Sequence, residues 1–186
     1  MTIQLAIAYL ALATASVAQT AVYGHNDKYA LPDRSMTPGA VNPAIVGDPS
    51  GKSIIVQGVE ANICAKGFTP HPYMKVTETI RNQVCEKYAG KGCSNLTNGR
   101  INRLIPLEIG GNDTIENLWW QPEPDFAAKD ETDNNLKSLV CSGKISLTTA
   151  QATVKANWVN SMWVTQSLRK CKNCTVTIAP LIKTSK

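Results

Sequence analysis

The segment from residue 100 to residue 137 gathers the side chains whose types could do chemistry in this chain of 186 residues. Asn102 and Asp133 carry oxygen atoms that could hold a divalent ion such as Mg²⁺, Mn²⁺ or Zn²⁺. Arg103 and Asn117 are the other candidates for a functional role in this segment. A phosphate group, on nucleic acid or on another polyanion, would be bound by basic side chains. The candidates for such a basic cluster are Arg100, Arg103, Lys129 and Lys137.

Each candidate also has a structural interpretation that involves no ligand. Asp133 follows Asp130 and Glu131 near the start of a predicted helix, where acidic side chains stabilise the positive end of the helix dipole. Glu108 and Asp113 flank a Gly-Gly turn, and carboxylates in such turns are commonly only solvated. The basic side chains could likewise be surface charges screened by salt. Residue types alone leave both interpretations open.

Turn signals and hydrophobic spacing predict the elements that position these residues. Asn98-Gly99 is a strong turn signal, and β-branched residues follow it. A second turn is expected at 110–113, and Gly143 is a natural end for the helix that comes later. The predicted elements are a strand over 100–108 that Pro106 ends, a returning segment at 114–120 and a helix over 125–141. Together they make a ββα unit.

Further elements are predicted on either side of this unit. Ser146 can cap a last helix, in which an apolar stripe at spacing four would share one face. The stripe consists of Ala150, Val154, Trp158 and Met162. The other predicted elements are a short strand at 53–59, a helix at 75–88 that stops before Gly90, and an edge strand at 175–178. The predicted fold class is therefore α+β, with a ββα core flanked by two or three helices.

The composition is typical of a single exported domain. Hydrophobic residues make up 43% and charged residues 18%, which allows a packed core. Residues 1–18 are predicted to be a signal peptide, because an alanine-rich apolar run too short to span a bilayer ends in Ser-Val-Ala. No later apolar run is long enough for a membrane helix, so we expect a soluble, extracellular monomer. The predicted organisation is an extended arm at 19–52, a folded domain at 53–170 and a C-terminal tail at 171–186.

Two features bear on the partners of the protein. The net charge is +5 and the pI is about 8.9, which permits attraction to nucleic acid or another polyanion, although solubility alone also explains such a charge. Three Asn-x-Ser/Thr sequons, at Asn95, Asn112 and Asn173, would accept glycans if the source is a eukaryote. A host protein is the other class of partner that an exported protein could bind.

The cysteines predict a disulfide framework. They form an even set, which is typical of disulfides in an oxidising compartment: Cys64, Cys85, Cys93, Cys141, Cys171 and Cys174. Sequence leaves the pairing open, but the short spacings favour Cys85–Cys93 and Cys171–Cys174, which leaves Cys64–Cys141 as a long clamp. A zinc site is the alternative. It has only one Cys-x-x-Cys, with no second pair and no nearby histidine.

Six short motifs occur in one order between residues 101 and 163. They are LIPLEIGG (104–111), NLWWQP (117–122), AKD (128–130), VCSG (140–143), AQ (150–151) and NW (157–158). In this order they resemble a family of small secreted proteins with an HNH-like core, which is a ββα-metal nuclease fold. Residues 39–43 and Ile63-Cys64 also fit, so the resemblance covers most of the chain from about residue 39 to about residue 170.

The resemblance implies a site that holds one divalent cation against a scissile phosphate. In that chemistry a histidine activates water and an asparagine, which Asn117 matches, braces the loop. This chain departs from the family at the decisive dipeptide, because Asn102-Arg103 stands where the family has Asp-His. An amide is an uncharged, weaker metal ligand, and an arginine stays protonated, so it cannot accept a proton from water.

Two functional hypotheses follow from this departure. In the first, the protein is a non-catalytic, effector-like member of the fold that binds an extracellular or host target. In the second, it is an active metal-dependent nuclease with an unorthodox site at Asn102, Arg103, Asn117 and Asp133. His71, in a proline-flanked loop, could approach that site or could be a surface residue, and His25 is the other histidine. The first hypothesis is preferred, because Asn102-Arg103 removes the family's general base and one of its metal ligands. Positioned acid–base catalysis alone is worth about 10²–10⁴-fold in rate.

Overall fold

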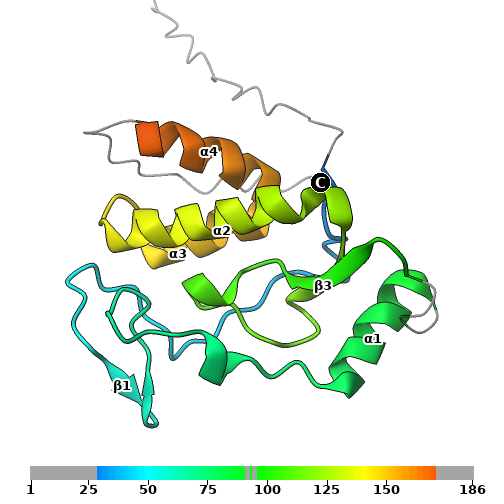
Figure 1. Ribbon diagram of the computed structural model, residues 1–186, viewed down its shortest axis with the longest axis horizontal. Coiled ribbons are helices and arrows are strands. Elements are labelled where there is room, and N and C mark those ends of the chain that lie inside the picture. The colour runs from blue at the N-terminus through cyan, green and yellow to red at the C-terminus, as the bar shows by residue number, and fades with distance from the viewer. Residues whose placement is uncertain (1–28, 91–92, 94–95, 171–186) are drawn as a thin grey trace, which may run out of the picture.

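The computed structural model describes residues 29–90, 93 and 96–170. Within those residues the fold is mixed α+β, with four α-helices and two small antiparallel sheets (Figure 1). The predicted α+β class is therefore confirmed. The predicted signal peptide at 1–18, the start of the arm at 19–28, and the tail at 171–186 with its edge strand and its Cys171–Cys174 pair lie outside the described residues.

A two-stranded sheet and the helix after it organise the centre of the molecule. β3 (Gly99–Arg103) pairs antiparallel with β4 (Leu118–Pro122), so that Asn102 lies opposite Trp119. A single 3-10 turn, η4 (Glu123–Asp125), connects β4 to α2 (Phe126–Cys141). The elements therefore follow one another in the predicted order of strand, strand and helix.

The first strand is shorter than predicted. It ends at Arg103, and the chain then makes a loop that contains η3 (Leu107–Ile109) before it returns as β4. Pro106 cannot donate to a sheet, and the loop closes on itself so tightly that a Cβ atom on Gly111 would lie 1.8 Å from the carbonyl oxygen of Ile105. Only glycine fits there, so the Gly-Gly motif serves the closure of this loop.

The helix predicted at 75–88 is confirmed with its stop at Gly90, although it begins three residues later than predicted. α1 (Glu78–Ala89) begins after Thr77, whose side chain accepts a hydrogen bond from the amide of Ile80. It ends at Gly90, which has a φ of 64°.

The single helix predicted after Ser146 is wrong, because the structure has two. α3 (Leu147–Ala156) and α4 (Trp158–Lys170) are separated by Asn157, which is extended at φ −169° and ψ 111°. Its side chain accepts hydrogen bonds from the amides of Val159 and Asn160 and so caps α4. The apolar stripe at spacing four is nevertheless buried throughout.

The strand predicted at 53–59 is also wrong as a single element. β1 (Ile55–Val56) and β2 (Val59–Glu60) form a hairpin around Gln57 and Gly58, which have φ values of 51° and 79°. Two residues with positive φ are what a tight two-residue hairpin turn requires.

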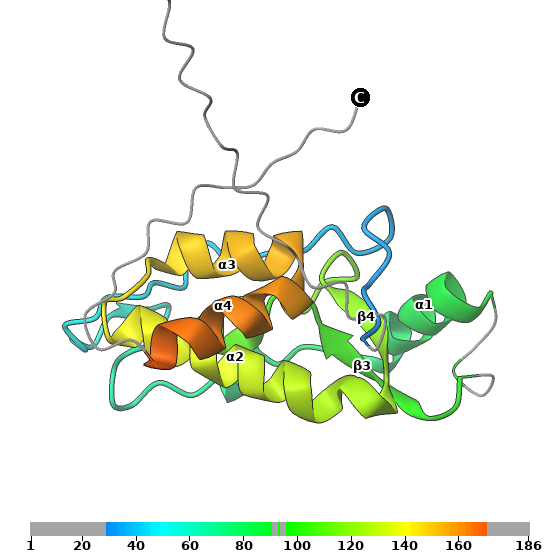
Figure 2. The same cartoon turned by 90° about the horizontal axis from the view of Figure 1, so that it is seen from above.

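The core lies between the central sheet and a layer of three helices. α3 and α4 lie alongside α2, whereas α1 lies at the other end of the molecule, against β4 (Figure 1, Figure 2). Large buried side chains from the sheet, α2 and α4 meet in one cluster, among them Trp119, Leu136, Val140 and Trp158. Residues 29–52 have no helix or strand of their own, and they join this body through backbone hydrogen bonds such as Gly39 to Glu116.

Two of the predicted disulfides are present. Cys64–Cys141 joins the loop after β2 to the end of α2, and Cys85–Cys93 joins the end of α1 to the loop after it. In the part of the chain that the structure describes, no cysteine is free. None of the helices in that part has the length and apolar character needed to cross a membrane. Of the sequons only Asn112 is described, and its Oδ1 atom accepts a hydrogen bond from the amide of Asp113.

Candidate functional site

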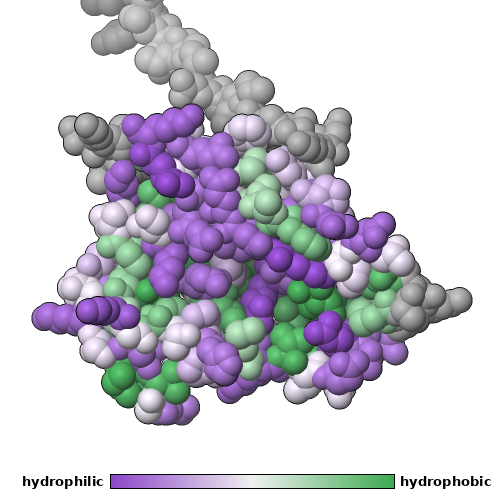
Figure 3. Space-filling view, viewed as in Figure 1, coloured by the Kyte–Doolittle hydropathy of each residue, from purple (hydrophilic) through white to green (hydrophobic). Residues whose placement is uncertain are grey.

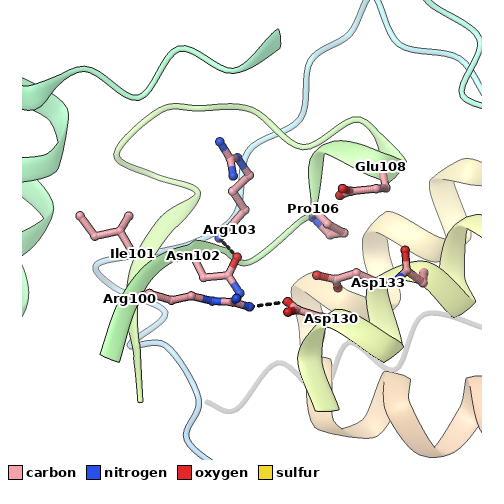
Figure 4. Close-up of a pocket in the computed structure, with 9 residues that line it drawn as sticks. Arg100, Ile101, Asn102, Arg103, Pro106, Glu108, Asp130 and Asp133 are labelled. Atoms are coloured by element: carbon pink, nitrogen blue, oxygen red, sulfur yellow. Dashed lines mark hydrogen bonds and ion pairs between the residues drawn. The ribbon is translucent and has the colours of Figure 1, made fainter. Parts of the chain in front are cut away.

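A cavity of about 420 Å³ opens between β3, η3 and α2. It brings together four of the predicted site residues, namely Arg100, Asn102, Arg103 and Asp133. The rest of its wall is formed by Ile101, Pro106, Glu108, Asp130 and Asn134. Figure 4 shows the carboxyl groups of Glu108, Asp130 and Asp133 on one side of this space and Arg100 on the other. Asn117, Lys129 and Lys137 do not line it.

Arg103 is held by an internal carboxylate. Its Nε and Nη2 atoms donate to the two oxygens of Asp113, and the second of these distances is 3.0 Å. Asp113, whose side chain is 2% exposed, also accepts the backbone amide of Lys75. The guanidinium therefore fastens β3 to the loop before β4, and through Asp113 to the segment before α1. In Figure 4 it points away from Asp130 and Asp133.

Asn102 is also committed to neighbours inside the protein. Its Nδ2 atom donates to Oε1 of Gln121, and its Oδ1 atom accepts the backbone amide of Arg103. Gln121 is fully buried, and it donates in turn to the carbonyl oxygen of Asp125. The Nδ2 end of the Asn102 amide thus supports the connection between the sheet and α2, while its Oδ1 end is held by the backbone of β3.

Lys129 and Asp133 form a buried ion pair one turn apart on α2. The Nζ atom of Lys129 lies 2.6 Å and 2.8 Å from the two carboxylate oxygens of Asp133. Lys129 is 0% exposed, so it is not part of a surface cluster as the sequence suggested; its charge is instead neutralised in the interior. Burial raises the pKa of Asp133 to about 7, against the opposing effect of Lys129, and the charges of Glu108 and Asp130 raise it further.

Arg100 pairs with an acidic residue at the mouth of the cavity. Its Nη2 atom binds Oδ1 of Asp130, and its guanidinium lies 4.2 Å from the centre of the Phe126 ring. Lys137 lies elsewhere, with its Nζ atom 5.1 Å from the centre of the Phe68 ring. The four basic side chains predicted to form one cluster are therefore not assembled, because only Arg100 and Arg103 share the cavity.

Asn117 braces the loop between the two strands. It is fully buried, its Oδ1 atom accepts the amide of Ile105, and its Nδ2 atom donates to the carbonyl oxygens of Ile105 and Asn112. This geometry matches the bracing role that the sequence assigned to it. A catalytic contact from this side chain to the cavity is not seen.

The described residues do not fit the predicted divalent ion. No three histidine, cysteine, aspartate or glutamate side chains among them form a group that could hold a metal ion. Asp133 presents both oxygens to Lys129, and Asn102 is bound to Gln121. His71, at the start of η1 (His71–Tyr73), is exposed and does not line the cavity. No catalytic step through a metal follows from this arrangement.

Sequence reasoning missed part of the cavity wall. Ile101, Pro106 and Asn134 were not singled out, and Glu108 was interpreted as a solvated carboxylate. One signal was present, because Asp130, Asp133 and Asn134 recur at the spacing of one helix face.

Comparison of the chain with protein-family models, with curated proteins and with solved structures found no match. The functional argument therefore rests on the residues of the cavity and on the motifs of the sequence.

Proposed function

We propose that this chain is a secreted binding protein with an HNH-like core that no longer hydrolyses phosphodiesters. The ordered motifs between residues 101 and 163 and the order of β3, β4 and α2 support the HNH-like part of the proposal. The apolar run at residues 1–18 and the two disulfides support secretion, because disulfides persist in oxidising compartments. Its target is an extracellular or host molecule, as for a secreted effector.

One observation carries the non-catalytic part of the proposal. The two groups that would have to serve hydrolysis, Arg103 and Asp133, are both bound to oppositely charged partners inside the protein. Arg103 cannot take a proton from water, because a guanidinium is already protonated at any ordinary pH. Asp133 cannot receive a metal ion while Lys129 occupies both of its oxygens.

A metal-dependent nuclease remains the second candidate, because of one feature of Asp133. A carboxyl group with a pKa of about 7 that lines a cavity has the acidity of a general base. Against this candidate, the Asp133 side chain is only 10% exposed and is turned to Lys129.

The test of the proposed function is a cleavage assay. The oxidised protein is incubated with supercoiled plasmid and with a structured RNA, in Mg²⁺, Mn²⁺ or Zn²⁺ and in EDTA. We expect no cleavage above the buffer control in any metal. Metal-dependent cleavage that is lost in Asp133→Ala but kept in Glu131→Ala, an exposed acid on the same helix, would overturn the proposal in favour of the nuclease.

A further inference from the structure

We propose that the cavity between β3 and α2 binds a cationic group, a guanidinium or a primary amine, rather than a phosphate. The inference rests on the proposed function, because it specifies what the binding protein recognises at that site. It concerns the same cavity, whose wall holds three carboxylates and two guanidiniums.

When the charged groups that the structure describes around the cavity are matched in ion pairs, one carboxylate is left without a partner. Arg100 is paired with Asp130, Arg103 with Asp113, and the buried Lys129 with Asp133. The remaining charged group on the wall is Glu108, which has no hydrogen bond or ion pair with any residue that the structure describes. An unpaired carboxylate in a hollow attracts a cation.

The grouping of the carboxylates on the cavity wall points the same way. The carboxyl groups of Glu108, Asp130 and Asp133 lie together on one side of the cavity (Figure 4), so this corner disfavours a further negative charge. A cation entering the cavity would relieve that repulsion.

The shape and lining of the cavity suit an alkyl chain that ends in a cation. Ile101 and Pro106 give it an apolar part, while the carboxyl groups lie together on the side of η3 and α2 (Figure 4). A guanidinium can bind a carboxylate such as Glu108 through two parallel hydrogen bonds. Figure 3, which has the same view as Figure 1, shows a largely hydrophilic surface over the upper middle of the molecule.

A phosphate is disfavoured in the same place. It would face the carboxylates of Glu108, Asp130 and Asp133, and the guanidinium of Arg103 points away from them (Figure 4). The net charge of the whole chain does not change this balance. Four of its five net positive charges come from residues outside the described ones, where five lysines (Lys28, Lys91, Lys172, Lys183 and Lys186) are opposed by Asp27 alone.

The experiment titrates the oxidised protein with three probes while amide resonances are followed by NMR. The probes are a blocked Gly-Arg-Gly peptide, spermidine and inorganic tripolyphosphate. We expect the two cations, at about millimolar concentrations, to shift the amides of Ile101, Asn102 and Asn134. Glu108→Gln should weaken that binding by roughly tenfold or more, since a charge-assisted hydrogen bond is worth about 1.5–3 kcal/mol and about 1.4 kcal/mol is tenfold. The matched variant Glu131→Gln, which removes an exposed acid outside the cavity, should change it by less than about twofold.

The outcomes separate the two proposals. Binding of the peptide alone identifies a basic peptide side chain as the ligand, and binding of spermidine alone identifies a free polyamine; both support the inference. Shifts caused by tripolyphosphate and not by the cations overturn it, as does equal weakening in Glu108→Gln and Glu131→Gln. Absence of any shift also overturns it, and leaves the non-hydrolytic function to be decided by the cleavage assay.

Discussion

Lys129→Met is expected to lower the free energy of unfolding by about 3–5 kcal/mol, because it leaves the carboxylate of Asp133 buried without a partner. The pair is fully enclosed on the lysine side, and both carboxylate oxygens depend on that single ammonium group. Chemical denaturation at pH 8, followed by circular dichroism, measures the loss.

The loss should shrink as the pH is lowered to 5. Burial raises the pKa of Asp133 to about 7 in the folded protein, above its ordinary value of 3.8, so the folded state binds the extra proton between those values. The contribution of this group to stability therefore increases as pH falls from 8 to 5, in the wild type and more so in Lys129→Met. Below about pH 4 the carboxyl is protonated in both states, and the contribution no longer changes with pH.

Removing both charges provides the control for this prediction. Lys129→Met combined with Asp133→Leu should recover most of the lost stability, because no unpaired charge is left in the interior. Asp130 lies on the same helix as Lys129 and forms an exposed pair with Arg100 of β3. Asp130→Asn, which breaks that pair, should cost less than about 1 kcal/mol of stability. A Lys129→Met variant as stable as Asp130→Asn at pH 8 would show that the pair does not exist as described.

Replacing Cys64 and Cys141 together by alanine is the second change with a large expected effect. The bond connects residues 77 apart in sequence, and it ties the loop after β2 to the end of α2 beneath the helical layer. Closing a loop of that length in the unfolded chain corresponds to about 4–5 kcal/mol of stability. The loss is measured as the shift in urea midpoint under non-oxidising, non-reducing conditions. The m-values of the variant and the wild type are compared as a check on the unfolded state.

The short disulfide supplies the matched comparison. Cys85 and Cys93 are 8 residues apart, so alanine at both positions should cost only about 2–3 kcal/mol. The order of the two losses is the prediction. A larger loss from the short bond would mean that the contacts of α1, and not the restriction of the unfolded chain, dominate the effect of cross-linking.

The sequence predicted those features of the fold that depend on a single residue type or on a short spacing along the chain. The stop of α1 at Gly90, the extent of α2 and the two described disulfides were predicted from residue type and spacing, whereas the Thr77 cap of α1 was not. The break at Asn157 was missed, because the stripe at spacing four runs across it and periodicity reports side-chain faces rather than backbone continuity. The hairpin at 55–60 was missed because its two-residue strands are too short to show a period.

The site was harder to predict than the elements that hold it. Lys129 and Asp133 are four residues apart on a helix, which is the spacing of an ion pair, so that pairing could have been found. The partner of Arg103 could not have been found from the sequence. Asp113 reaches it only because the loop between β3 and β4 folds back through its Gly-Gly closure and the Asn117 brace, and spacing along the chain does not encode that approach.

The account of the proposed function depends on Asp133 and Asn102, the two predicted metal ligands, being bound to neighbours inside the protein, and Mn²⁺ binding followed by electron paramagnetic resonance tests this most directly. At micromolar, equimolar concentrations the wild-type protein should leave the six-line signal of free Mn²⁺ at full amplitude, because Asp133 and Asn102 already have partners. A loss of that signal at one ion per chain, restored by Asp133→Ala and not by Glu131→Ala, would contradict the account.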